Sequence, residues 1–205
     1  MNNKNISFTQ LDVLREIGTI GAGRAATALA DLLNCKVEIN LPETKLVPLS
    51  TLDKVLGNPE ELYFVLDITI EGDIGGRFFF LLPPNEAKIL GGTLLGQEAD
   101  DIDVDDMMFQ SSLKEMINIL AGAYLNALAD MTSLTILYSI PSIALDMIAA
   151  LLDYFFIQIA QSTDEAIFVK TKIKVQDIDF SGFFLFFPDF ESLRKIFDIL
   201  GVSSS

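Results

Sequence analysis

The chain contains no histidine and only one cysteine, and these two scarcities exclude several kinds of chemistry. Without histidine the protein cannot use Ser-His-Asp or Cys-His catalysis or form a phosphohistidine, and most zinc sites are excluded as well. The single cysteine, Cys35, cannot form an intramolecular disulfide. The activities that remain are those that need neither a histidine base nor a disulfide framework.

Basic residues are also scarce. The sequence has 14 Lys and Arg against 29 Asp and Glu, which gives a formal net charge of −15. A surface of this charge repels a phosphate backbone, so we expect no nucleic-acid partner. Half of the residues are hydrophobic, and the simplest role of the acidity is to keep an apolar chain soluble.

Long uninterrupted apolar segments are missing as well. The most apolar stretch, residues 143–160, contains Asp146 and Asp153, so it is not predicted to cross a membrane. The polar start of the chain, Met-Asn-Asn-Lys-Asn, lacks the apolar segment of a signal peptide. We therefore expect a cytoplasmic protein without a membrane partner.

The chain does contain an internal repeat. Residues 16–33 and 115–132 are identical at eight of eighteen aligned positions, and Pro42 and Pro141 keep the same offset of 99 residues. The phenylalanine-rich segments 76–83 and 182–188 resemble each other too. Two copies are too few for a solenoid. The repeat instead predicts a single domain over residues 1–205, made of two pseudo-symmetric halves at about 8–96 and 105–201.

Each half is predicted to follow the order α-β-α-β-β-α, and this order indicates an α+β fold. Three strands per half predict one six-stranded, mostly antiparallel sheet covered by helices, with the two long helices presenting the sites. The expected helices are 9–33, 52–56, 85–95, 106–131, 142–159 and 190–200, and the expected strands are 36–41, 62–71, 74–82, 134–140, 167–175 and 178–187.

The long helix of each half is predicted to have an apolar face and, opposite it, a narrow polar stripe. With about 100° per residue, the expected buried positions of the second helix all lie opposite Glu115. The expected buried residues are Leu113, Ile117, Leu120, Tyr124 and Leu128, and the expected polar stripe is Ser111, Glu115, Asn118 and Gly122. In the first helix the corresponding stripe is Asp12, Glu16, Thr19 and Gly23.

One interpretation of the stripe is an ordinary solvated helix face with a capping acid. Three features favour a docking edge that presents two polar groups instead: the stripe is repeated, it carries little other charge, and it contains a glycine. A glycine within a helix costs up to about 1 kcal/mol relative to alanine. A bare helix surface at Gly23 or Gly122 would let the backbone of another protein approach closely.

The spacing Asp/Ser-x3-Glu-x2-Asn-x22-Pro resembles the signature of the CheC, CheX and FliY family of chemotaxis phosphatases. In the second half every position matches, whereas in the first half Thr19 stands where the family has asparagine. Residues 16–23 are also similar to the E-I-G-N-I-G-x-G opening that is typical of CheC-like members, and the resemblance covers about residues 8–201. The matching residues are Ser111, Glu115, Asn118 and Pro141 in the second half and Asp12, Glu16 and Pro42 in the first.

The resemblance implies dephosphorylation of the phospho-aspartate of a CheY-type response regulator. It implies no metal or cofactor of the protein's own, because the regulator brings Mg²⁺. In this reading Asn118 orients the attacking water, Glu115 pairs with a lysine of the regulator, and the first site, with Glu16 and Thr19, is the weaker one.

Two alternatives of other classes remain open from the sequence. CheC-like members also bind the receptor deamidase CheD, so the chain could be a non-catalytic or weakly catalytic partner that regulates CheD. A more distant alternative is a scaffold within the flagellar switch.

Overall fold

The computed structural model describes residues 8–202, and the polar N-terminal segment used above for the predicted location lies outside this range.

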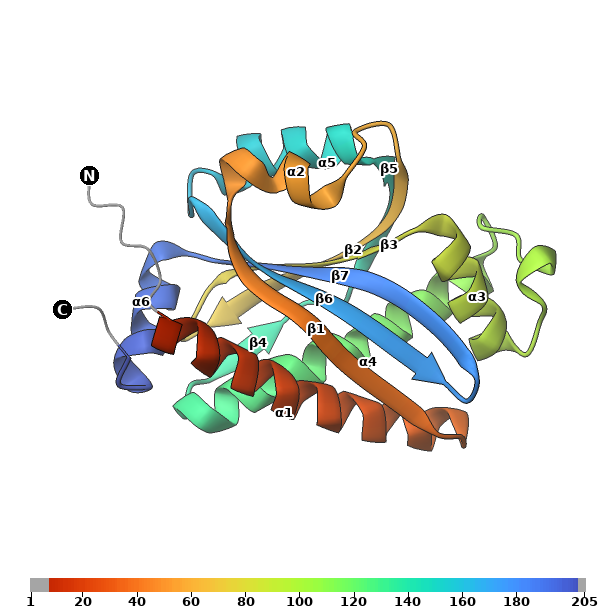
Figure 1. Cartoon of the computed structure of the whole chain (residues 1–205), viewed down its shortest axis with the longest axis horizontal. Helices are drawn as coiled ribbons and strands as arrows, with labels where there is room; N and C mark the ends of the chain where they lie inside the picture. Colours follow the sequence, from red (N-terminus) through yellow and green to blue (C-terminus); the bar gives the residue numbers. More distant parts are fainter. Residues whose placement is uncertain (1–7, 203–205) are drawn as a thin grey trace.

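One sheet forms the middle of the molecule, and helices cover both of its faces (Figure 1). The α+β class and the position of both long helices on one side of one sheet are therefore confirmed. The long helices are α1 (Phe8–Leu33) and α4 (Met107–Thr132); α2 (Leu52–Leu56) and α5 (Ile148–Tyr154) cover the opposite face, and α3 (Pro84–Leu95) and α6 (Phe190–Ile199) lie toward the two ends.

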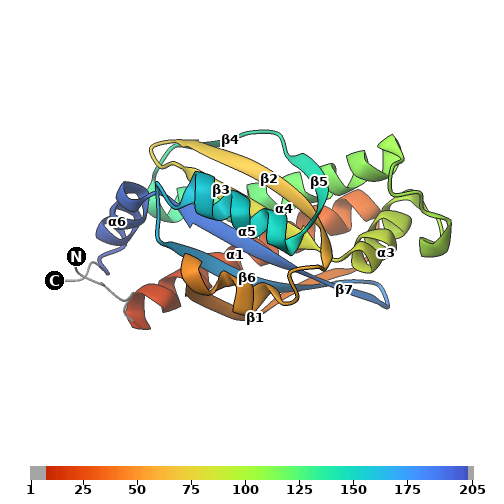
Figure 2. The same ribbon diagram turned by 90° about the horizontal axis from the view of Figure 1, so that it is seen from above.

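The sheet has seven strands, all paired in antiparallel fashion. Its order is β1-β6-β7-β3-β2-β4, and β5 also pairs with β2. The first strand of each half therefore lies on the hairpin of the other half, and exchanging the halves leaves this order unchanged (Figure 2). The strands are β1 (Val37–Pro48), β2 (Leu62–Gly72), β3 (Gly76–Leu82), β4 (Ile136–Tyr138), β5 (Ser142–Met147), β6 (Glu165–Val175) and β7 (Ile178–Pro188).

The phenylalanine-rich strands are buried on both faces because helices cover both faces. Successive side chains of a strand point to opposite sides, so Phe78 and Phe80 pack in the core beneath α1 and α4, while Phe79 and Leu81 pack in the core beneath α2 and α5. Each core draws residues from both halves of the chain. The two cores are thus the two faces of one sheet rather than the centres of separate domains.

The predicted helix over residues 142–159 is wrong in its first third. Residues Ser142–Met147 form β5, which pairs with Leu62–Asp67 of β2, and the helix begins only at Ile148 and passes into a π-helical turn at Phe155–Ile159. The outer backbone groups of β2 need hydrogen-bond partners. β5 supplies them at this edge, and tertiary pairing overrides the local helical pattern.

The two repeated prolines lie at irregularities of the edge strands, which explains the difference from the predicted six strands. β1 does not end at Pro42 but continues to Pro48, with a register shift between Asn40 and Glu43. Proline lacks the amide hydrogen of a strand ladder and is tolerated at an edge or a bulge. In the second half, Pro141 separates β4 from β5, so a single predicted strand becomes two.

No helix among residues 8–202 combines the length and the apolar character needed to span a membrane. Two short 3-10 turns, Leu49–Thr51 and Ala99–Asp101, precede α2 and α4 respectively. The second lies within the aspartate-rich segment 97–106, which joins the two halves.

Candidate functional site on the two long helices

Helix α4 is held at both ends and along its buried face. The carboxylate of Asp106 accepts a hydrogen bond from the Met108 amide at 3.2 Å, which caps the first turn. Ser133 ends the helix in the left-handed conformation with φ 55°. All five residues predicted to face the core are buried, namely Leu113, Ile117, Leu120, Tyr124 and Leu128.

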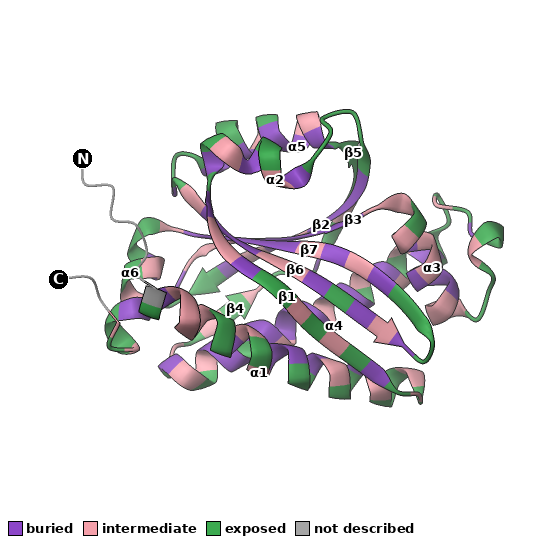
Figure 3. Cartoon of the chain, in the orientation of Figure 1, coloured by how far each residue is buried: buried purple, intermediate pink, exposed green. Residues whose placement is uncertain are grey.

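This arrangement leaves the polar pair of α4 on the outer side of the helix. Glu115 and Ser111 are exposed and Asn118 is half-buried. Both long helices carry exposed as well as buried positions (Figure 3). Side chains at i and i+3 lie about 5–6 Å apart at their Cβ atoms, so the carboxylate of Glu115 and the amide of Asn118 are neighbours on one surface. Within residues 8–202, neither side chain has a hydrogen-bond or ion-pair partner. Both are free to contact another molecule.

Gly122 does not belong to the exposed stripe, contrary to the sequence prediction. It is buried, and a Cβ atom added to it would lie 2.6 Å from the hydroxyl oxygen of Tyr138 in β4. The helical period places Gly122 near Glu115 in angle, but β4 covers this part of α4. The glycine therefore makes room for an intramolecular contact and not for a partner's backbone.

The segment around Pro141 is anchored beside α4. The amide of Ser139 donates to the carbonyl of Thr69 at 2.9 Å, and the amide of Thr69 donates to the hydroxyl of Ser139 at 3.0 Å. Pro141 itself is buried. Pro141 thus lies in a segment that is fixed to β2 and that contacts α4 at Gly122 through Tyr138.

The second candidate site lies on α1, where most of the polar side chains already have partners within the protein. Glu16 and Thr19 are exposed, but the hydroxyl of Thr19 donates to the carbonyl of Arg15 at 2.8 Å. Asp12 is half-buried and pairs with Arg15 at 3.3 Å, and Arg15 also reaches the carbonyl of Thr44 at 3.4 Å. The polar groups at this site are therefore engaged within the protein to a greater extent than those on α4.

The surroundings of the first site also differ. An added Cβ at Gly23 would meet nothing within 4 Å, so this glycine is open as predicted. Pro42 is exposed at the register shift of β1. Leu41, which precedes it, packs against α1, where its Cδ1 would lie 3.0 Å from a Cβ on Gly18.

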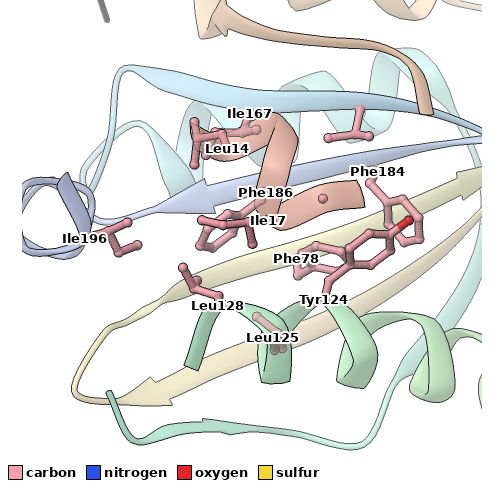
Figure 4. Close-up of a pocket in the computed structure, with 12 residues that line it drawn as sticks. Leu14, Ile17, Phe78, Tyr124, Leu125, Leu128, Ile167, Phe184, Phe186 and Ile196 are labelled. Atoms are coloured by element: carbon pink, nitrogen blue, oxygen red, sulfur yellow. The ribbon is translucent and has the colours of Figure 1, made fainter. Parts of the chain in front are cut away.

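The two helices run in opposite directions and make close contact at Gly21 and Tyr124 (Figures 1 and 2). A Cβ on Gly21 would lie 2.9 Å from the Cα of Tyr124, so only glycine permits this approach. A narrow apolar cavity of about 70 Å³ lies beside this contact, between the helices and the sheet (Figure 4). Among the residues that the structure describes, the Tyr124 hydroxyl has no hydrogen-bond partner, and its burial raises the pKa of this group.

A separate polar hollow of about 460 Å³ lies between the β2–β3 turn and α6. Its lysine, Lys195, already pairs with Asp73 at 3.2 Å, and none of the predicted site residues lines it. Within residues 8–202, no group of three or more Cys, Asp or Glu side chains is arranged to hold a metal ion.

Tyr138 is a site neighbour that sequence reasoning missed. It lies three residues before Pro141, and the helical period alone cannot reveal which strand packs on a glycine. The repeat gives no signal either, because Leu41, which contacts the long helix of the first half, is the equivalent of Ile140 and not of Tyr138.

Comparison with known proteins places these observations in a family. Residues 10–46, which contain the first stripe, match the model of the CheC-like family. The chain is 36% identical over 204 residues to a Bacillus subtilis protein named CheY-P phosphatase CheC, covering 97% of both chains.

Solved structures share the fold. The crystal structure of FliY from Thermotoga maritima has a TM-score of 0.77 with 16% identity, covering 97% of this chain and 98% of that one. CheX in a complex with CheY, BeF₃ and Mg²⁺ from Borrelia burgdorferi has a TM-score of 0.52 with 14% identity, covering 90% and 99% of the two chains. Given the identity to Bacillus subtilis CheC over nearly the whole length, together with the repeated Glu-bearing helices, this chain belongs to the CheC-like family.

Proposed function

We propose that this protein is a phosphatase that hydrolyses the phospho-aspartate of a CheY-type response regulator in chemotaxis. The observation that carries the proposal is the outward pair Glu115 and Asn118 on α4, which has no intramolecular partner among the described residues. The activity named for the 36% identical relative supports it, as does the CheX–CheY complex formed by a protein of the same fold.

The chemistry suits a protein without histidine. Water attacks the phosphorus atom as the bond from phosphorus to the aspartate oxygen breaks, and the products are inorganic phosphate and the free carboxylate. Such a transfer requires mainly positioning and charge stabilisation from the protein. The carboxamide of Asn118 both donates and accepts hydrogen bonds and is uncharged beside the phosphoryl anion, so it is suited to orienting the attacking water.

Glu115 has the docking role in this proposal. Its exposed carboxylate would pair with the active-site lysine of the regulator and bring α4 to the phosphoryl group. Mg²⁺ would be held by the regulator, and we assign no metal to this chain. A cytoplasmic location follows from a soluble phosphorylated substrate of this kind.

The test is release of inorganic phosphate from a phosphorylated CheY-type regulator in the presence of Mg²⁺. Wild-type protein should accelerate release over the regulator's own rate, and Asn118→Ala should not. Asn126→Ala is a matched control, because Asn126 is an exposed asparagine on the same helix, about 12 Å farther along its axis than Asn118. Equal acceleration by wild-type protein and Asn118→Ala would sink the proposal.

Regulation of CheD remains the alternative function. Such binding would use a surface other than the α4 stripe, and Phe156 and Ile157 are exposed apolar side chains on the opposite side of the sheet. A double variant Glu115→Ala with Asn118→Ala separates the two functions. If it still binds CheD with wild-type affinity but releases no phosphate, the two activities use different surfaces.

A further inference from the structure

Ile140 is the most exposed of the large hydrophobic residues in the described chain, at 88%. Removing an apolar side chain from water is favourable, so the exposure of Ile140 is unfavourable in the isolated protein. It stands directly before Pro141, one of the residues of the family signature.

The backbone that carries Ile140 is fixed on both sides. Ser139 exchanges two hydrogen bonds with Thr69, and Pro141 is buried. Tyr138, one residue further back, rests on Gly122 of α4. An apolar side chain held in this way loses little conformational freedom on binding, which is the property of a preorganised contact.

The contacts of neighbouring and equivalent residues place Ile140 near Asn118 along the axis of α4. The chain leaves the end of α4, turns back along the helix and reaches Gly122 at Tyr138. From Gly122 to Asn118 the helix rises by about 6 Å, and two residues of extended chain span about the same distance. The first half agrees, because Leu41, the repeat equivalent of Ile140, contacts Gly18 beside Thr19.

A second exposed apolar residue stands at the other end of the stripe. Met108 is 66% exposed and precedes Glu115 by seven residues, which places it on the same side of α4 about 10 Å along the axis. Ser111, Glu115 and Asn118 therefore lie between two exposed apolar side chains.

The first site lacks both apolar residues. Thr9 occupies the position equivalent to Met108, and Leu41 is half-buried against α1 instead of projecting into solvent. The apolar pair thus accompanies the helix that has asparagine and is absent from the helix that has threonine.

We propose that Met108 and Ile140 form an apolar rim that docks the phosphorylated regulator onto α4, through apolar side chains of the regulator beside its phosphorylation site. The inference rests on the function proposed above. It also makes the two helices unequal in affinity, since only α4 has both the rim and the asparagine.

The rim predicts a separation between binding and chemistry. Ile140→Ser removes apolar contact but no group that touches the water or the phosphoryl oxygens. We therefore expect KM for the phosphorylated regulator to rise about tenfold with kcat within about twofold of wild type, because uniform binding energy is lost. Met108→Ser should raise KM by about threefold in the same manner.

Matched controls are available elsewhere on the surface. Leu137 is 59% exposed on β4, three residues before Ile140, and Leu32 is 54% exposed near the end of α1. Leu137→Ser and Leu32→Ser should leave both KM and kcat unchanged. Unchanged KM in both rim variants, or a fall in kcat alone, would overturn the inference.

A direct binding measurement separates this inference from the proposed function. The probe is the CheY-type regulator loaded with beryllofluoride and Mg²⁺, titrated into full-length protein by calorimetry. If wild type binds and Ile140→Ser binds about tenfold more weakly, the rim is supported even where no phosphate is released. Equal affinity of wild type and both rim variants overturns the rim even where phosphate is released normally. Circular dichroism of each variant confirms that it is folded.

Discussion

The hydroxyl of Thr19 donates a hydrogen bond to the carbonyl oxygen of Arg15, 2.8 Å away in the preceding turn of α1. Threonine commonly bonds back to a helix in this way, and here the bond directs the hydroxyl hydrogen inward. Asn118, the equivalent residue on α4, has no such bond among the described residues. The two halves share a fold but present different groups to a partner.

Loss of either polar group on α4 should abolish most of the activity. We expect Asn118→Ala and Glu115→Ala each to lower the rate of dephosphorylation by about 10²–10³, the loss typical of removing one preorganised polar group. Phosphate release under single-turnover conditions measures it. Near-wild-type rates in a folded Asn118→Ala protein would contradict the assignment.

Restoring asparagine to the first helix should create activity there. In the background Glu115→Ala with Asn118→Ala, we expect Thr19→Asn to raise the residual rate, because the longer amide reaches solvent where the threonine hydroxyl bonds to Arg15. A positioning error of about 1 Å can cost about 100-fold, so recovery should be partial. If Glu16→Ala with Thr19→Ala damages the wild-type rate as much as the α4 double variant does, the first site is already active and our ranking is wrong.

Tyr124 should be replaceable by phenylalanine with a gain in stability. Its buried hydroxyl has no hydrogen-bond partner within residues 8–202, and an unsatisfied buried group costs about 1–3 kcal/mol. Tyr124→Phe should therefore raise the free energy of unfolding by about 1 kcal/mol in urea denaturation. The control Tyr138→Phe should change it by less than about 0.5 kcal/mol, since Tyr138 is only half-buried. A loss of stability in Tyr124→Phe would show that the hydroxyl is satisfied in solution.

The two equivalent glycines of the stripes should respond to alanine with opposite signs. Gly23→Ala adds a methyl group into open space and should stabilise the protein by about 0.5–1 kcal/mol through the helix propensity of alanine. Gly122→Ala places its methyl group against the Tyr138 hydroxyl and should destabilise by about 1 kcal/mol. Thermal and urea unfolding of both variants test this.

A further change at Tyr138 tests whether its hydroxyl causes the loss of stability in Gly122→Ala. Tyr138→Phe removes the oxygen that Gly122→Ala would meet, so the double variant should regain much of the lost stability. If Gly122→Ala is as stable as Gly23→Ala, β4 does not rest on α4 as described.

The helical period was sufficient to predict the polar pair, because the buried side of α4 and the spacing of Glu115 and Asn118 both follow from one repeat of about 3.6 residues. It was insufficient for Gly122, whose burial depends on Tyr138, a residue from another element. An angle around a helix says which way a residue faces but not what packs there.

Strand β5 was missed for a related reason. Ser142–Met147 places a large apolar residue at every second position, but the apolar sequence continues without a break into α5, and the strand conformation also depends on the free edge of β2 about 80 residues earlier in the chain. Pro42 and Pro141 were both predicted to end strands. Both lie where an edge strand is irregular, but only Pro141 divides its strand into two.

Because each half pairs its first strand with the hairpin of the other half, neither half is expected to fold by itself. β1 completes the hairpin of the second half, and β4 with β5 completes the hairpin of the first. A fragment holding only one half would leave its own hairpin edge unpaired and its first strand without a neighbour, and both are groups that proteins avoid exposing. Two identical half-length chains could satisfy each other in the same pattern, so the present molecule has the architecture of a symmetric dimer joined into one polypeptide. Joining the copies allowed the residues of one helix to diverge without altering the other, a freedom that a true dimer of identical chains does not have.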